Sequence, residues 1–192
     1  MDSRAIKKSV LYYSRPGKEN TEDTLAMARE RAIELGIDTI IVASTGGATA
    51  IQAAEYFKGF KLVIVCHYTG FREPNVQELA PEARSAVESM GGVVHIATHA
   101  FGGVGRSIRN KFNTYQTEEI IAQTLRIFGE GIKVVCEIAL MAADAGLVNT
   151  GQDAVCIGGT GHGADTAVVL QPVNAQRFLD LKIKEIICKP RL

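Results

Sequence analysis

Short apolar runs alternate with amphipathic segments along most of the chain. We expect strands where apolar residues follow one another, at residues 9–13, 39–43, 61–66, 93–98, 154–157, 166–170 and 185–188. Apolar residues recur at helical spacing in the segments 20–35, 50–58, 81–90, 117–128, 132–145 and 174–181. The central strand runs are continuously apolar, which is typical of strands buried on both faces. The pattern therefore predicts an α/β protein, a three-layer α/β/α sandwich around a mostly parallel sheet.

One strand pair is expected to depart from the parallel arrangement. Residues 154–157 and 166–170 are joined by a turn that is too short for a crossover, which takes about a dozen residues or more. We therefore expect an antiparallel hairpin at the edge of the sheet. A chain of 192 residues with 46% hydrophobic residues suits one domain with a substantial core, so we predict a single α/β/α domain over residues 1–192.

Two stretches have a less regular pattern. Residues 99–115 are glycine-rich and basic and show no clear periodicity, so we expect a long loop of the kind that serves as a lid or a binding loop. The helix predicted at 132–145 is apolar nearly all round, except for a narrow stripe formed by Lys133, Glu137 and Asp144. We expect that stripe to be a solvated edge of the helix.

Charge and cysteine content exclude several classes of function. Lysine plus arginine and aspartate plus glutamate number 21 each, so nothing indicates a nucleic-acid partner. The apolar runs are far shorter than a membrane span and no signal-peptide pattern opens the chain, so we expect no membrane partner. The cysteines are widely separated and lie mostly in apolar runs, as Cys66, Cys136, Cys156 and Cys188. Buried, reduced thiols in a cytoplasmic protein are the expected state.

The unusual residues concentrate where the parallel strands are expected to end. Open parallel sheets bind ligands beyond the carboxyl ends of their strands. Glycines, hydroxyl residues and histidines gather in the segments that follow those ends, at residues 14–20, 44–49, 67–70, 99–106 and 158–163. The opposite edge receives plain turns such as 35–38 and 58–60. This asymmetry predicts a small-molecule site at the carboxyl edge of the sheet.

The turn between the second strand and its helix has the composition of a phosphate-binding turn. It consists of Ser44, Thr45, Gly46, Gly47, Ala48 and Thr49. Backbone N–H groups at a helix N-terminus are unpaired and lie at the positive end of the helix dipole, where phosphates bind. The alternative is an ordinary strand–helix turn with a serine or threonine cap. The sequence has no Walker A lysine, no G-x-G-x-x-G after the first strand and no G-x-S-x-G elbow, which counts against those enzyme classes.

The glycine run at residues 158–163 opens a hairpin and not a helix. Its Gly159, Thr160 and Gly161 could wrap a phosphate or a sugar, or simply turn the chain. Asp165, beside this run, is either a hydrogen-bond acceptor for a ligand or a hairpin-turn aspartate.

The histidines do not form a recognisable metal site. His67, His99 and His162 follow strand ends and could converge, yet no carboxylate or cysteine lies at ligand spacing from them. We therefore predict no metal. His99 or His162 could instead be the base of a hydrolase, a hypothesis for which the sequence offers no nucleophile.

With these residues in view, the chain resembles the pyruvate kinase C-terminal-domain-like family, and more narrowly its stand-alone archaeal members, which lack the kinase barrel. The local match is the turn 44–50 with its strand and helix, followed by residues 62–65. In pyruvate kinases the equivalent turn is Thr-Lys-Ser-Gly-Arg-Ser-Ala and holds a phosphate of an allosteric sugar bisphosphate. Gly47, Thr49 and Ala50 keep that pattern, whereas both basic residues of the kinase turn are replaced.

The resemblance to the stand-alone group covers almost the whole chain, including residues 16–21, 131–147 and 163–166. It implies a bound flavin mononucleotide (FMN) and no established reaction, so the chain would be a flavin enzyme of unknown substrate or a flavin carrier. The ribityl phosphate would then lie on residues 45–49. Beyond the turn, the residues expected at the cofactor are His67, Tyr68, Thr69, His99, Gly159, Thr160 and Gly161, with Tyr68, Phe71 or Phe101 covering one face of the ring.

A second hypothesis is a non-catalytic sensor of a phosphorylated metabolite, as in the regulatory domain of pyruvate kinase. Both hypotheses place a small phosphate-bearing molecule at the same edge of the sheet. The resemblance leaves open whether the chain is an enzyme, and it is compatible with a homo-oligomer.

Overall fold

A seven-stranded sheet forms the middle layer of the protein, which a computed structural model describes over residues 5–192. The strand order is β1-β7-β6-β5-β2-β3-β4. The strands are β1 (Leu11–Tyr13), β2 (Thr39–Ala43), β3 (Lys61–Cys66), β4 (Val93–Ile96), β5 (Ala154–Gly158), β6 (Thr166–Gln171) and β7 (Lys182–Pro190). Strand β6 runs antiparallel to both of its neighbours, and every other pair in the sheet is parallel. The predicted antiparallel pair and the mostly parallel sheet are therefore confirmed, and β5 and β6 lie inside the sheet, with β2 and β7 as their outer neighbours.

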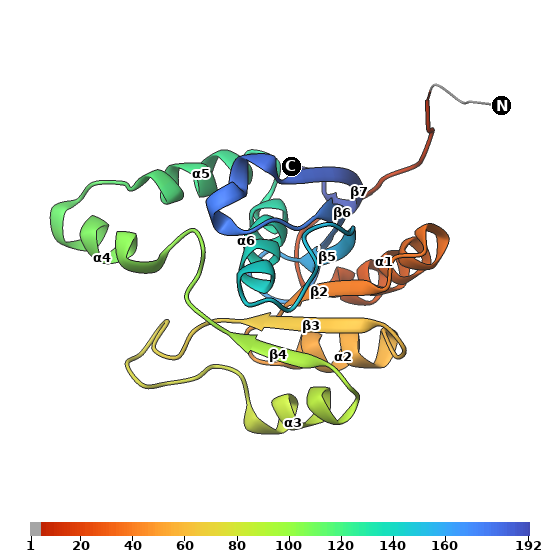
Figure 1. Cartoon of the computed structure of the whole chain (residues 1–192), viewed down its shortest axis with the longest axis horizontal. Coiled ribbons are helices and arrows are strands. Elements are labelled where there is room, and N and C mark those ends of the chain that lie inside the picture. Colours follow the sequence, from red (N-terminus) through yellow and green to blue (C-terminus); the bar gives the residue numbers. More distant parts are fainter. Residues whose placement is uncertain (1–4) are drawn as a thin grey trace.

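Helices cover both faces of this sheet (Figure 1). The helices are α1 (Thr21–Leu35), α2 (Ala48–Tyr56), α3 (Pro81–Ser89), α4 (Gly103–Phe112), α5 (Thr117–Arg126) and α6 (Glu130–Asp144), with 3-10 turns η1 (Lys18–Asn20) and η2 (Ala175–Asp180). Helices α1, α2 and α3 share one core with alternate residues of the sheet, whereas α6 shares a second core with the residues between them. The three-layer sandwich predicted from the sequence is confirmed.

The central strands are buried on both faces, as their continuous apolar runs predict. On β2, Ile40 and Val42 pack in the core under α1 and α2, and Ile41 packs against α6 on the opposite side. All three side chains are fully buried. Because a strand side chain points alternately to the two faces, a strand in the middle of a three-layer sandwich needs an apolar residue at every position.

The four cysteines are free and buried, as predicted. Removal from water raises the pKa of the Cys66 and Cys136 thiols to about 12. These thiols therefore stay protonated and unreactive at neutral pH. Across residues 5–192, no helix is both long and apolar enough to cross a membrane.

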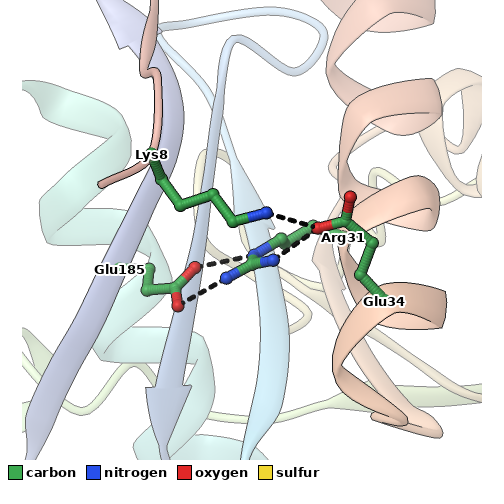
Figure 2. A network of polar contacts seen from close by, with 4 residues as sticks. All are labelled: Lys8, Arg31, Glu34 and Glu185. Carbon is green, nitrogen blue, oxygen red and sulfur yellow. Dashed lines mark hydrogen bonds and ion pairs between the residues drawn. The ribbon is translucent and has the colours of Figure 1, made fainter. Parts of the chain in front are cut away.

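An ion-pair network joins α1 to the β7 side of the sheet (Figure 2). Two nitrogens of Arg31 donate to the two carboxylate oxygens of Glu185, at 2.7 and 2.8 Å. Arg31 also contacts Glu34, which accepts a hydrogen bond from Lys8 at 3.0 Å. Such bidentate arginine–carboxylate pairs fix orientation as well as adding energy. The network holds the C-terminal half of α1 against β7.

The prediction of a long loop at residues 99–115 is wrong, because most of this segment forms the helix α4. Its apolar residues Val104, Ile108 and Phe112 recur every four residues, which is a helical period. The glycines at positions 102, 103 and 105 concealed this period, since glycine disfavours a helix interior. The helix ends at Phe112, and the next residue, Asn113, has a φ of 52° that turns the chain towards α5.

Candidate functional site

The carboxyl ends of the parallel strands meet at one edge of the sheet, and the segments richest in glycine, hydroxyl and histidine residues follow them. The segments after β2 and β5 are neighbours because these strands pair directly, and the segment after β3 lies on the other side of β2. Helix α6 also begins at this edge, where Gly131 lies so close to Thr166 that a Cβ would be 2.0 Å from its Oγ1. Figure 1 shows α4 and the loop after β3 beyond this same edge.

The turn at residues 44–49 presents an uncapped helix N-terminus. Gly47 is the residue before α2, and no side chain caps the first turn of this helix. Two features require glycine at position 47. The φ of Gly47 is 104°, and a Cβ on this residue would lie only 2.3 Å from the Cβ of Ala83. Gly46 and Ala48 are exposed. The first N–H groups of α2 are thus available to an external acceptor.

Ser44 places a second polar group at the start of this turn. Its backbone N–H donates to the carbonyl of Val65 at 3.0 Å, which anchors the turn to β3. Its hydroxyl is buried and has no hydrogen-bond partner among the residues that the structure describes. A buried hydroxyl without a partner is costly, and it marks a point where an additional polar group would be stabilised.

His67 faces the same turn from the loop after β3. Its Nε2 lies 3.5 Å from Thr45 Oγ1, and its Nδ1 lies 2.7 Å from Glu78 Oε2. Arg72 forms an ion pair with the other oxygen of Glu78 at 3.0 Å. With Nδ1–H donating to Glu78, Nε2 carries a lone pair in the neutral ring and an N–H in the protonated ring. The Nε2 atom of His67 is therefore the ring nitrogen that lies toward the turn.

Aromatic rings gather beside His67 and form what we call the aromatic cluster, composed of His67, Tyr68, Phe71 and His99. The ring centroids of His67 lie 4.1 Å from Phe71 and 4.9 Å from His99, and Tyr68 lies 5.6 Å from His99. The guanidinium of Arg106, from α4, stacks on Phe71 at 4.8 Å. The cluster thus joins the segments after β3 and β4 to α4.

His99 is neutral at physiological pH. Burial of the ring is the main cause that lowers its pKa to about 4, and the nearby charges of His67, Lys133 and Arg106 act in the same direction. The carboxylate of Glu137 opposes them. A neutral ring that packs against aromatic neighbours suits an apolar or stacking contact better than an ionic one.

The depressed pKa of His99 makes the protein less stable in acid. The folded protein binds fewer protons than the unfolded chain between about pH 6.5 and pH 4, so stability is complete above pH 6.5 and is lost as pH falls towards 4. We expect a loss of up to about 1 kcal/mol per pH unit after allowing for partial exposure. Urea unfolding between pH 7 and pH 5 should show a smaller loss for His99→Phe, which keeps the ring contacts but does not titrate. Equal losses in both proteins would contradict the assignment.

The prediction that Lys133, Glu137 and Asp144 form a solvated edge of α6 is wrong for two of these residues. Lys133 and Glu137 are buried and form an ion pair one helical turn apart, whereas Asp144 is exposed. The Glu137 carboxylate also accepts a hydrogen bond from the backbone N–H of Phe101 at 2.9 Å. Packing of the segment after β4 over this part of α6 excludes water from the pair. It thereby holds residues 99–102 against α6.

Asp165 organises the glycine hairpin and is not a free acceptor. Its side chain is fully buried and accepts hydrogen bonds from the N–H groups of Gly17 and Thr160, both at 3.1 Å, and from the Thr166 hydroxyl at 2.8 Å. The hairpin-turn interpretation is therefore the one the structure favours. Because the N–H of Thr160 is already paired, it is not available to donate to a ligand.

The structure brings together only part of the predicted set. The turn 44–49, His67, Tyr68 and His99 lie at the carboxyl edge and are linked by the contacts above. Thr69 is exposed and its hydroxyl accepts a hydrogen bond from Gln77 at 3.2 Å. Gly159 is packed against the carbonyl of Gly163, where a Cβ would lie at 2.4 Å, and Gly161 is exposed. His162 is exposed on the same hairpin and takes no part in the described ring contacts.

Sequence reasoning missed the charged residues that hold this edge together, namely Arg72, Glu78, Arg106 and the Lys133–Glu137 pair. Only the last pair carried a signal, since its spacing of four residues is that of a helical ion pair. Glu78 lies 11 positions from His67, in a loop whose path no local pattern predicts. Among the residues that the structure describes, no group of three or more histidine, cysteine, aspartate or glutamate side chains could hold a metal ion.

A comparison with protein families finds one model that matches most of the chain. It is described as the pyruvate kinase alpha/beta domain and matches residues 22–170. The matched range contains the turn 44–49, the aromatic cluster, α6 and the glycine hairpin.

Proposed function

Since the chain belongs to the pyruvate kinase alpha/beta domain family, we propose that it binds a phosphorylated small molecule at the carboxyl edge of its sheet, and that this molecule is FMN. The family membership supports a domain that resembles the regulatory domain of pyruvate kinase. The flavin goes beyond that membership and is the part of the proposal that the experiment below tests first.

The observation that carries the proposal is the uncapped N-terminus of α2 beside a buried hydroxyl that lacks a partner. Anions bind at helix N-termini because the free N–H groups and the helix dipole both favour negative charge. The turn adds the hydroxyls of Ser44, Thr45 and Thr49, and His67 Nε2 approaches Thr45. A phosphate there would satisfy the Ser44 hydroxyl as well as the N–H groups of the helix.

The charges around the turn favour a single phosphate group. Residues 44–49 contain no lysine or arginine, so backbone amides and hydroxyls would hold the anion, with His67 as the nearest ionisable group described at the turn. Two phosphates of a sugar bisphosphate would bring more negative charge than these groups balance. FMN carries one phosphate.

The aromatic cluster supports a ligand with a flat ring. Tyr68, Phe71 and the neutral His99 pack against one another next to His67, which itself approaches the turn, and a flat ring could stack on the partly exposed Tyr68 or Phe71. The same molecule could then place its phosphate on the turn and its ring near the cluster. Bound FMN would supply electron transfer, and the residues described here would bind, orient and shield it.

The second candidate is a sensor of a phosphorylated metabolite, which the family membership itself favours. It uses the same turn but does not need the aromatic cluster. A hydrolase that uses His99 or His162 as base gains no support, because His99 is surrounded by aromatic rings and His162 is exposed on the hairpin.

The test separates phosphate recognition from ring recognition. The purified chain is examined for the visible absorption of oxidised flavin, and isothermal titration is then run with FMN, with riboflavin, which lacks the phosphate, and with sugar mono- and bisphosphates. We expect FMN to bind at least about 100-fold more tightly than riboflavin, because the phosphate supplies charge-assisted hydrogen bonds worth several kcal/mol in total. Tighter binding of a sugar phosphate than of FMN would favour the sensor. Equal affinities for FMN and riboflavin would mean that the turn at residues 44–49 does not bind the phosphate.

A further inference from the structure

Helices α4 and α5 carry the largest group of exposed apolar side chains that the described chain shows on consecutive elements. We call it the α4–α5 face, composed of Val104, Ile108, Phe112, Tyr115, Ile120, Ile127 and Phe128. These side chains are 37% to 79% exposed. The α4 members recur every four residues, so this helix presents one apolar stripe. Tyr115 lies in the connection to α5, Ile120 lies on α5, and Ile127 and Phe128 directly follow it. Figure 1 shows both helices at one end of the molecule.

Helix α4 has little packing of its own within one chain. Gly105 is the one buried residue among its ten residues. A helix of this length is marginal in water unless an apolar face is packed. The apolar stripe of α4 therefore calls for a partner surface that a single chain does not provide.

The arm formed by α4 and α5 is nevertheless held in a defined shape. Arg109 forms an ion pair with the buried Glu119 of α5 at 3.1 Å. Gly105 approaches the side chain of Glu118 so closely that any Cβ would collide with it. These contacts fix the position of α4 relative to the start of α5, so the exposed apolar side chains lie on a preformed structure.

We propose that the α4–α5 face is the interface through which two copies of this chain form a twofold dimer. A fully exposed aromatic side chain presents roughly 150 to 250 Å², so the three aromatic residues of the face leave on the order of 350 Å² open. With the four aliphatic residues, the surface approaches the roughly 800 Å² that each partner buries in a standard interface.

The charges beside the face favour a second copy over a membrane surface. A basic amphipathic helix binds anionic lipid through free cations that flank its apolar stripe. On α4, Arg106 is stacked on Phe71 and Arg109 is paired with Glu119, so two of the three basic residues of this helix are held within the chain and Lys111 alone is exposed. An apolar stripe with its arginines already paired suits a self-complementary contact, in which the same face of two chains meets across a twofold axis.

The oligomeric state of the full chain tests this inference, without any ligand. Sedimentation velocity and light scattering should give twice the mass of one chain for the wild type. The double variant with Ile108→Glu and Phe112→Glu should be monomeric, with the dissociation constant raised at least about 100-fold, since two carboxylates would be buried at the contact. The control is Ile33→Glu, which adds a charge at an exposed isoleucine of α1 on the other face of the sheet and should stay dimeric.

A second measurement covers the case in which the double variant loses helix α4. A photoreactive benzoylphenylalanine is placed at position 112 of the otherwise unchanged chain, and the cross-linked peptides are identified by mass spectrometry. Cross-links to α4 or α5 of a second copy support the interface. A monomeric wild type, a dimer that survives the double variant, cross-links to another surface, or a monomer that sediments with phosphatidylglycerol vesicles would each overturn it.

Discussion

Gly46→Glu should abolish binding of phosphorylated ligands and leave the fold intact. Gly46 is exposed, a Cβ at this position meets nothing within 4 Å, and its backbone does not need glycine. The new carboxylate would lie at the uncapped N-terminus of α2, where it would compete with and repel a phosphate. Like charges brought together at a binding site cost several kcal/mol. We expect the affinity for FMN, measured by isothermal titration, to fall by a factor of about 100 or more.

The matched control for this substitution is Gly46→Ala, which adds a methyl group and no charge. It should change the affinity by no more than a few fold, because the space beside Gly46 is open. Both variants should unfold within about 0.5 kcal/mol of the wild type, as is usual for exposed positions. Unchanged ligand affinity in Gly46→Glu would mean that the phosphate lies elsewhere on this edge.

Glu137→Ala should destabilise the protein by about 3–5 kcal/mol, the cost of removing one partner from a buried ion pair. The substitution leaves the Lys133 ammonium buried without its carboxylate, and it leaves the N–H of Phe101 without its acceptor. In a chain of this length each kcal/mol lowers Tm by roughly 2–4 °C. Urea unfolding at neutral pH and a thermal scan would measure both quantities.

Two comparisons isolate the buried charge as the cause. Glu88→Ala removes the acid of an exposed pair at the same helical spacing, Arg84–Glu88, and should cost less than about 1 kcal/mol. The double variant with Lys133→Met and Glu137→Gln removes the charges while keeping an acceptor for Phe101, and it should recover most of the loss. A small effect of Glu137→Ala, close to that of Glu88→Ala, would mean that water reaches the pair.

The layered fold could be predicted because it depends on patterns that are local in the chain. Continuous apolar runs such as residues 62–66, rich in β-branched residues, are typical of strands buried on both faces. The short connection between β5 and β6 leaves no room for a crossover, so their antiparallel pairing follows from chain length alone. The phosphate-binding interpretation of residues 44–49 rests on the same kind of evidence, since the turn and the helix it opens are contiguous.

The amino-acid sequence by itself determined the sandwich, the buried thiols and the gathering of glycine, hydroxyl and histidine residues at the carboxyl edge of the sheet, because strand and helix periods and turn composition act over a few residues. Only the tertiary structure decided that Lys133 and Glu137 are buried, that Glu78 holds His67, and that Asp165 ties the hairpin instead of facing a ligand. These contacts join residues whose separation in the chain carries no periodic signal, or depend on which segment packs over a helix. The apolar stripe of α4 depends on both: its four-residue period can be found in the sequence, whereas its exposure is known only from the tertiary structure.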